Sequence, residues 1–135
     1  MLKIAFVCIH NSCRSQMAEA WGGKLLHGIA EVYSAGTEEY SEVKPLAQEV
    51  MQEVGIDTSK QFPKLLKDIP SELDVVITMG CGVECPNIPT RYREDWGLED
   101  PSGGSIEDFR RTRDLIEGKV LELKSRILDG VFKQG

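Results

Sequence analysis

Apolar residues gather in short runs separated by stretches of mixed polarity. Residues 73–79 form the clearest run, because the segment is rich in β-branched residues and apolar on both faces, as a central strand of a parallel sheet should be. Residues 4–7 form a second run of this kind. Two shorter segments, residues 32–34 before an Ala-Gly turn signal and residues 92–96, predict two further strands.

Three longer segments repeat apolar residues every three or four positions and predict helices. They span residues 14–26, 45–54 and 106–128, and a single helical turn is expected over residues 64–68. Within the last helix, the residues expected to face the core are Phe109, Leu115, Ile116, Val120, Leu123 and Ile127.

Strands and helices alternate along the whole chain. With right-handed crossovers, this order predicts a three-layer α/β/α domain: a central, mostly parallel four-stranded sheet with helices on both faces. The length of 135 residues suits one domain, residues 1–135. Ligands of such sheets bind beyond the carboxyl ends of the strands, so chemistry is expected in the loops that leave that edge.

The amino-acid composition limits which classes of binding partner and which cellular compartment are expected. The net charge of −6 disfavours nucleic acid and anionic membrane surfaces as partners. The first apolar run is too short for a signal peptide or a membrane span, so a cytoplasmic location is expected. In that compartment four cysteines are expected to be reduced, catalytic or metal-bound rather than joined in permanent disulfides.

The strongest candidate site follows the first predicted strand directly and leads into the first predicted helix. Backbone N–H groups of a strand-to-helix turn point inward, and the new helix presents its positive end, so the main chain alone can cradle a tetrahedral anion. The residues expected to form this cradle are Ile9, His10, Asn11, Ser12, Cys13 and Arg14.

Cys8 and Arg14 bracket this turn and give it a reactive group and a charge. The planar guanidinium of Arg14 can grip two oxygens at once, and the local positive field favours the thiolate of Cys8, which is the nucleophilic form. Ser15 can hydrogen-bond the sulfur. Taken singly, Cys8 would be a buried cysteine at a strand end and Arg14 a solvent-facing helix residue; their joint placement favours a catalytic site.

Residues 80–104 have little regular pattern and predict a functional loop system. Cys81 and Cys85 lie in this segment, spaced Cys-x3-Cys. If the residues between them are helical, the two thiols are about 6 Å apart by helix rise, which permits a disulfide without demanding one. Two alternatives are half of a zinc site completed by Cys13 and a histidine, and plain packing. Because no second Cys-Cys or His-His pair follows, no metal is expected.

Four motifs together resemble the low-molecular-weight protein tyrosine phosphatase superfamily, and within it the thioredoxin-coupled arsenate reductases. They are the Cys8-x5-Arg14-Ser15 loop, the Gln-Met-Ala-Glu continuation at 16–19, the Tyr-Ser-Ala-Gly segment at 33–36 and the Asp100-Pro101 pair. The resemblance implies a low-molecular-weight phosphatase-like fold and a general-acid role for Asp100. Phosphatases of this kind usually follow the Asp-Pro pair with an aromatic residue that stacks on phosphotyrosine. Ser-Gly-Gly follows here, which favours a small inorganic oxyanion.

The resemblance also implies a thiol relay that needs no cofactor. Reduction of arsenate takes two electrons, which two thiols supply when they form one disulfide. Cys8 would attack arsenic, Cys81 would attack the Cys8 sulfur, and Cys85 would move the disulfide to Cys81–Cys85, where thioredoxin or a similar reductant could reach it. The alternatives are a phosphatase acting on small phosphoesters or phosphotyrosine, and a non-catalytic thiol sensor or metal-binding module.

Two positions depart from the family pattern. His10 stands where glycine is frequent; if the backbone there needs positive φ, histidine tolerates it at some cost. Several members bind potassium beside the cradle, and Asn11, Glu19 and Ser34 match residues of that site. A further carboxylate ligand falls near Lys64, where a lysine would repel or replace the cation. We therefore expect no potassium site.

Overall fold

The computed structural model describes residues 1–38, 40–80 and 88–132. A parallel sheet of four strands forms its centre, in the order β2-β1-β3-β4. The strands are β1 (Leu2–Cys8), β2 (Ala30–Gly36), β3 (Leu73–Thr78) and β4 (Thr90–Asp95). Each of the four predicted strands is confirmed. The α/β class and the parallel four-stranded sheet expected from the alternation of apolar patterns are confirmed with them.

The helices also form where the apolar spacing placed them. They are α1 (Arg14–Leu25), α2 (Pro45–Glu53), the 3-10 turn η1 (Leu66–Asp68) and α3 (Ile106–Leu128). The residues at the starts of two of these helices are ones that favour helix initiation. Pro45 occupies the first turn of α2, whereas Ser105 is the N-cap residue of α3, and its backbone N–H donates to the Asp108 carboxylate at 3.0 Å.

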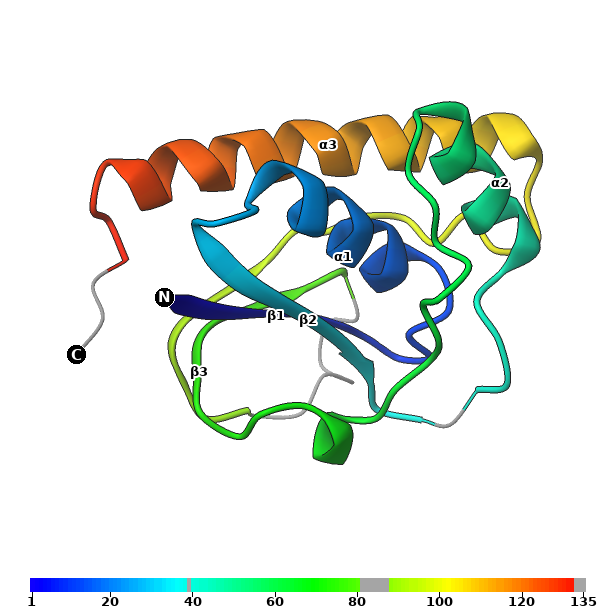
Figure 1. Cartoon of the computed structure of the whole chain (residues 1–135). Coiled ribbons are helices and arrows are strands. Elements are labelled where there is room, and N and C mark those ends of the chain that lie inside the picture. The colour runs from blue at the N-terminus through cyan, green and yellow to red at the C-terminus, as the bar shows by residue number, and fades with distance from the viewer. Residues whose placement is uncertain (39, 81–87, 133–135) are drawn as a thin grey trace.

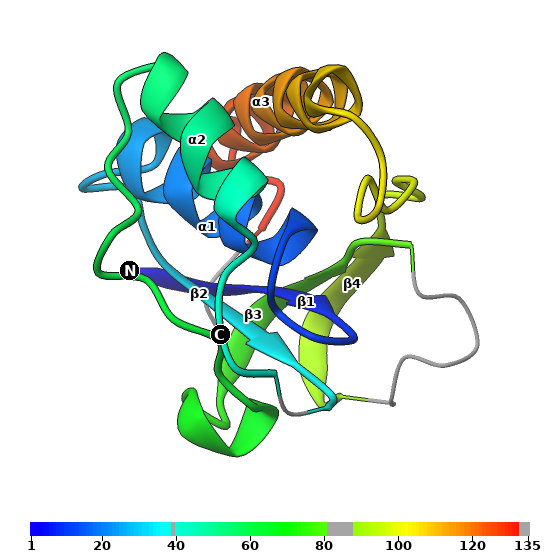
Figure 2. The ribbon, with the colours of Figure 1, turned by 90° about the vertical axis from the view of Figure 1, so that its right-hand side faces the viewer.

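The three α-helices pack together on one face of the sheet, where α3 crosses both α1 and α2 (Figures 1 and 2). The larger apolar core lies between them and the inward side chains of the strands, among them Ile4, Phe6 and Ile77. On the opposite face a smaller cluster around Val7 and Val76 is covered by the segment that contains η1. Within the described residues, this short helix forms the third layer.

One residue of α3 that was predicted to face the core, Leu115, lies on the surface. Leu115 is 53% exposed, and Thr112, one turn earlier, is buried. The remaining predicted positions face inward, with Ile127 only partly buried. The apolar stripe of a helix fixes its average orientation, but a leucine at the edge of that stripe can fall outside it.

In the described part of the chain, no helix is long and apolar enough to cross a membrane.

The topology brings three loops to the carboxyl edge of the sheet. Residues 9–13 leave β1, the chain after β3 begins at Met79, and residues 96–105 leave β4. Met79 continues the ladder beyond β3, since its N–H donates to the Val7 carbonyl at 3.1 Å. Residues that are far apart in sequence are therefore neighbours at this edge.

Candidate active site

A cavity of about 90 Å³ lies at the carboxyl edge of the sheet, enclosed by the loop between β1 and α1. Its lining is formed by Cys8, Ile9, His10, Ser12, Cys13, Arg14 and Asp100. The structure thus brings together the predicted nucleophile, cation and general acid, although Asp100 is 86 residues from Arg14 in sequence. A larger cavity of about 660 Å³ lies beside the Asp100 loop, but neither Cys8 nor Arg14 lines it.

The Cys8 sulfur ends β1 and receives two polar contacts. The Asn11 N–H donates to Sγ at 3.2 Å, and the Ser15 hydroxyl lies 2.8 Å from it. Donors directed at a sulfur stabilise its anionic form, because a thiolate accepts hydrogen bonds more strongly than a thiol does. The predicted contact between Ser15 and the sulfur is confirmed.

The start of α1 is open to an anion. Cys13 is the N-cap residue, no side chain caps this end, and the first turn holds no acidic residue among the described positions. Cys13 and Arg14 at this end also line the cavity, so the positive end of the helix dipole lies beside it. Of the six residues predicted to form the cradle, five line the cavity, and Asn11 does not.

Arg14 is buried, and main-chain carbonyls hold its side chain in place. Nη1 donates to the Met79 carbonyl at 2.7 Å and to the Leu98 carbonyl at 2.8 Å. Nη2 lies 3.9 Å from the Asp100 carboxylate. The carbonyls fix the guanidinium against the cavity wall, so a bound anion meets a preplaced charge.

Asp100 lies at the mouth of the cavity with half of its side chain exposed. Partial burial tends to raise its pKa. The hydrogen bond from the Ser102 N–H, at 3.0 Å, and the charge of Arg14 outweigh burial and hold the pKa below its usual value. The carboxyl group is therefore ionised at neutral pH in the free protein.

The sequence left open whether the backbone at His10 needs positive φ, and in the structure His10 does not have it. Among described non-glycine residues, Asn11 alone has a positive φ, at 53°. His10 instead lies at the rim, where Nε2 is 3.2 Å from the Glu38 carboxylate and the ring packs against Tyr40 with centroids 5.0 Å apart. The left-handed turn therefore belongs to an asparagine, a residue that tolerates this conformation well.

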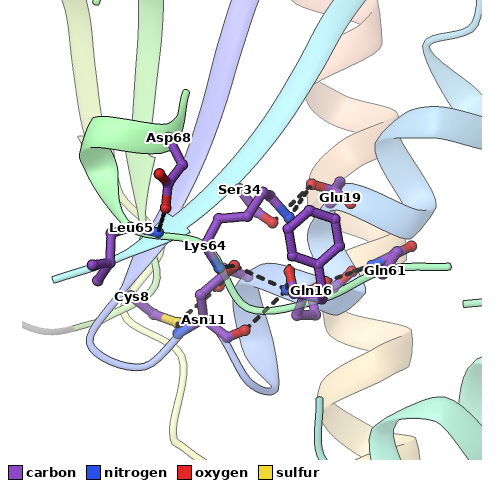
Figure 3. Close-up of polar contacts among 11 residues, drawn as sticks. Cys8, Asn11, Gln16, Glu19, Ser34, Gln61, Lys64, Leu65 and Asp68 are labelled. Atoms are coloured by element: carbon purple, nitrogen blue, oxygen red, sulfur yellow. Dashed lines mark hydrogen bonds and ion pairs between the residues drawn. The ribbon is translucent and has the colours of Figure 1, made fainter. Parts of the chain in front are cut away.

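Asn11 is the centre of a buried polar network behind the loop, shown in Figure 3. Its side-chain amide donates to Ser15 Oγ at 2.7 Å. Its Oδ1 accepts from Gln16 Nε2 and from the backbone N–H of Lys64, both at 2.9 Å. The asparagine side chain thus ties the turn to α1 and to the segment before η1.

Sequence reasoning did not identify two residues that shape the loop. Gln16 is buried and donates to the Asn11 carbonyl as well as to its side chain. Gly36 lies directly beneath the loop: a Cβ there would come within 2.7 Å of the Ile9 carbonyl oxygen and 2.9 Å of the Asn11 nitrogen. The sequence signals for Gly36 are the Ala-Gly pair, which indicates a turn after the strand, and the Tyr-Ser-Ala-Gly segment; neither indicates that the loop passes so close to it.

The two cysteines predicted to resolve the reaction, Cys81 and Cys85, lie outside the described residues. The zinc alternative used the same pair. Within the described part of the chain, no group of three or more His, Cys, Asp or Glu side chains is arranged to hold a metal ion.

Comparison with known proteins places these features in a family. Residues 3–131 match the low molecular weight phosphotyrosine protein phosphatase family. The arsenate reductase 2 of Staphylococcus haemolyticus (strain JCSC1435) is 42% identical over 127 residues, which are 91% of this chain and 96% of that protein.

The solved structures to which this chain is similar include arsenate reductases as well. An arsenate reductase in its phosphate-binding state superimposes with a TM-score of 0.86 at 43% identity, over 94% of this chain and 99% of that one. The thioredoxin-dependent arsenate reductase of Corynebacterium glutamicum has a TM-score of 0.79 at 34% identity, over 96% of this chain and 63% of that one.

Proposed function

Because the chain belongs to the low molecular weight phosphotyrosine protein phosphatase family and is 42% identical to arsenate reductases over most of its length, we propose that it reduces arsenate to arsenite. The observation that carries the proposal is the cavity of about 90 Å³ that Cys8, Arg14 and Asp100 line together. A cavity of this size has room for a small ligand such as a tetrahedral oxyanion and is much smaller than the roughly 300–1,000 Å³ typical of sites for larger molecules.

The reaction begins with arsenate in the cradle. Arg14 and the open end of α1 bind its oxygens, and the Cys8 thiolate attacks the arsenic atom. An S–As bond forms, and one arsenic-bound oxygen leaves as water after it has gained protons. The contacts from Asn11 and Ser15 hold the sulfur in line with the bound anion.

Asp100 supplies a proton only after the substrate has bound. Its carboxyl group is ionised in the free protein, because the Ser102 N–H and Arg14 lower its pKa. A bound arsenate places further negative charge beside it, and like charges favour the protonated carboxyl. Arsenate also carries protons of its own at neutral pH, so its reduction depends less on Asp100 than ester cleavage does.

The second half of the reaction uses Cys81 and Cys85. The Cys81 thiolate attacks the Cys8 sulfur, an S–S bond forms, and the S–As bond breaks with its electron pair on arsenic, which leaves as arsenite. Cys85 then attacks Cys81, which frees Cys8 as a thiolate and leaves a Cys81–Cys85 disulfide. Thioredoxin or a similar dithiol reduces that disulfide in the cytoplasm. The thioredoxin dependence of the Corynebacterium relative supports this choice of reductant.

Phosphatase activity on small phosphoesters is the second candidate. It needs only the three residues that already meet at the cavity, Cys8, Arg14 and Asp100. The segment Ser102-Gly103-Gly104 provides no ring that could stack on a phosphotyrosine side chain. Any such activity should therefore favour small esters over phosphotyrosine peptides.

A coupled assay tests both functions. Purified protein, thioredoxin, thioredoxin reductase and NADPH should consume NADPH when arsenate is added and not when phosphate is added. The Cys8→Ser variant should lose this activity, and also any hydrolysis of p-nitrophenyl phosphate, since a hydroxyl does not form the adduct. Hydrolysis of the ester without arsenate-dependent NADPH oxidation would overturn the proposal in favour of a phosphatase.

A further inference from the structure

The Lys64 side chain enters a largely enclosed polar region behind the Cys8 loop (Figure 3). Its ammonium lies 3.4 Å from Glu19 Oε1, and only 14% and 19% of the two side chains are exposed. The same ammonium donates to the Phe62 carbonyl at 2.9 Å and lies 4.8 Å from the centre of the Phe62 ring. Lys64 is thus a fixed cation rather than a solvated surface lysine.

Glu19 depends on this cation for charge balance. Its Oε1 also accepts a hydrogen bond from the buried Ser34 hydroxyl at 2.8 Å. A hydroxyl contributes a dipole but no charge, so the ammonium of Lys64 is what balances the carboxylate in this enclosed position. Removal of one partner from such a pair leaves an uncompensated charge away from bulk water.

The main chain of Lys64 connects this ion pair to the reactive sulfur. Its N–H donates to Asn11 Oδ1 at 2.9 Å, and its carbonyl accepts from the Gly36 N–H at 2.7 Å. Asn11 in turn contacts Ser15 Oγ and donates its own N–H to Cys8 Sγ. Two hydrogen bonds through Asn11 therefore connect the lysine to the nucleophile.

The residues present do not fit the potassium ion that the family resemblance implies at this place. Glu19 Oε1 already contacts the Lys64 ammonium and the Ser34 hydroxyl. Asn11 Oδ1 already accepts from two N–H donors, which use both of its lone pairs. The predicted ligands Asn11, Glu19 and Ser34 do lie together, but a lysine side chain provides the positive charge among them.

We propose that Lys64 is a tethered cation that positions the Cys8 loop and makes the reactivity of Cys8 independent of any dissolved monovalent cation. The ammonium holds the segment before η1 against Glu19 of α1. The backbone of that segment then fixes Asn11, and Asn11 fixes the sulfur. Lys64 is a positioning residue, since it acts through Asn11 and does not line the cavity. The arsenate readout below rests on the proposed function, whereas the alkylation readout does not.

The first test measures alkylation of Cys8 by iodoacetamide in the reduced protein, followed by peptide mass spectrometry. Lys64→Ala should slow alkylation by about a factor of ten to a hundred, the range that a small misplacement of a reacting group costs. Lys64→Arg, which keeps the charge, should retain most of the rate. Lys67→Met is the matched control, because Lys67 is an exposed lysine of η1, three residues away.

A cation rescue distinguishes positioning from a general loss of structure. Ammonium chloride should restore the alkylation rate of Lys64→Ala, since ammonium can enter the space beside Glu19, whereas tetramethylammonium chloride of equal ionic strength should not. The wild-type rate should be the same in both salts. Glu19→Gln combined with Lys64→Ala, which removes both charges, should fold but show no response to ammonium.

Arsenate reduction should follow the alkylation rates, with the loss in Lys64→Ala falling mainly on kcat. Two results would overturn the proposal: wild-type alkylation by Lys64→Ala in tetramethylammonium, or a severalfold rise in the wild-type rate in ammonium or potassium. A protein that reduces no arsenate but shows the expected alkylation pattern would overturn the proposed function and leave the role of Lys64 intact.

Discussion

Cys8 and Cys13 lie five residues apart in the same loop, yet their surroundings differ. Burial, together with the nearby Asp100 carboxylate, raises the pKa of the Cys13 thiol to about 12. At neutral pH Cys13 is therefore a neutral thiol. The Cys8 sulfur instead receives the Asn11 N–H and lies against the Ser15 hydroxyl. These different contacts support the proposal that Cys8, rather than Cys13, is the nucleophile.

Replacement of Asp100 tests the general acid at the residue scale. Asp100→Asn should reduce hydrolysis of phenyl phosphate by a factor on the order of 10²–10⁴, because a poor leaving group needs a proton. Arsenate reduction should fall less, since an arsenic-bound oxygen carries its own proton. Steady-state rates with both substrates measure the difference.

The control for Asp100 is its exposed neighbour Glu99, whose change to Gln should affect neither reaction. p-Nitrophenyl phosphate, with a better leaving group, should suffer a smaller loss than phenyl phosphate in Asp100→Asn. Equal losses for both esters and for arsenate would mean that Asp100 mainly holds its loop in place.

The role of a residue was predictable where the residues that act together are contiguous in sequence. It was less predictable where folding brings distant residues together. The Cys-x5-Arg spacing after a strand indicated the cradle, because seven consecutive residues contain it. The anchoring of Arg14 by the carbonyls of Met79 and Leu98 joins residues 65 and 84 positions apart, and no local pattern encodes it. The left-handed backbone that was considered for His10 is adopted by Asn11, and no local pattern indicated which of the two neighbours takes it.

At the scale of elements, the site depends on how closely the end of β2 passes beneath the loop after β1. The two strands pair in register up to Cys8 and Gly36. The N–H of Thr37 then donates to the Ile9 carbonyl at 2.8 Å, so the strand end and the loop are in direct contact. Only a residue without a Cβ fits at position 36, because backbone atoms surround it.

Gly36→Ala should therefore disable the loop. Its Cβ would meet three backbone atoms of residues 9–11 at 2.7–2.9 Å, and backbone cannot rotate away as a flexible side chain can. We expect a loss of stability of about 1–3 kcal/mol, typical of overpacking, and a larger proportional loss of arsenate reduction. Urea unfolding and steady-state kinetics measure the two effects.

Gly23→Ala is the matched control for Gly36→Ala. Gly23 lies within α1, and a Cβ there would meet nothing within 4 Å. Alanine should stabilise this helix by roughly 0.5–1 kcal/mol and leave activity unchanged. Wild-type activity in Gly36→Ala would show that the loop can shift without consequence, contrary to the role given to this crossing.

For the molecule as a whole, the apolar pattern was enough to predict the class, the strands and the helices, because β1 and β3 are buried apolar runs and α2 and α3 each bury a stripe of mostly apolar residues. The distribution of helices between the two faces was harder to foresee. α1, α2 and α3 pack together on one face, and the described part of the other is covered by η1 (Figure 2). That choice depends on how the elements fit one another, which periodicity within one element does not encode.

The whole molecule also has to direct a negatively charged substrate to one place. Its net charge is −6, so the average field repels arsenate. Attraction comes from Arg14, from the start of α1 and from Lys44, which is close enough to Asp100 to contribute to lowering its pKa. Binding of the substrate is therefore short-ranged. The chain after β3 leaves from the same edge of the sheet, where the Met79 carbonyl accepts a hydrogen bond from Arg14.

The relay can be tested by trapping its intermediate. If electrons pass from Cys8 to Cys81 to Cys85, Cys85→Ser should complete one turnover, release one arsenite per chain and then stop, because no thiol remains to free Cys8. Rapid quenching and arsenite quantification measure the burst. Digestion and mass spectrometry should then find Cys8 joined to Cys81 in the stalled variant.

Wild-type protein oxidised by arsenate provides the comparison for the trapped variant. It should contain the Cys81–Cys85 disulfide and a free Cys8 that iodoacetamide still alkylates. Cys81→Ser should release no arsenite with thioredoxin as reductant, since the arsenic adduct on Cys8 has no internal thiol to resolve it. Multiple turnover by Cys85→Ser would instead mean that the reductant attacks the Cys8–Cys81 disulfide directly, so that two thiols of this chain suffice for the reaction.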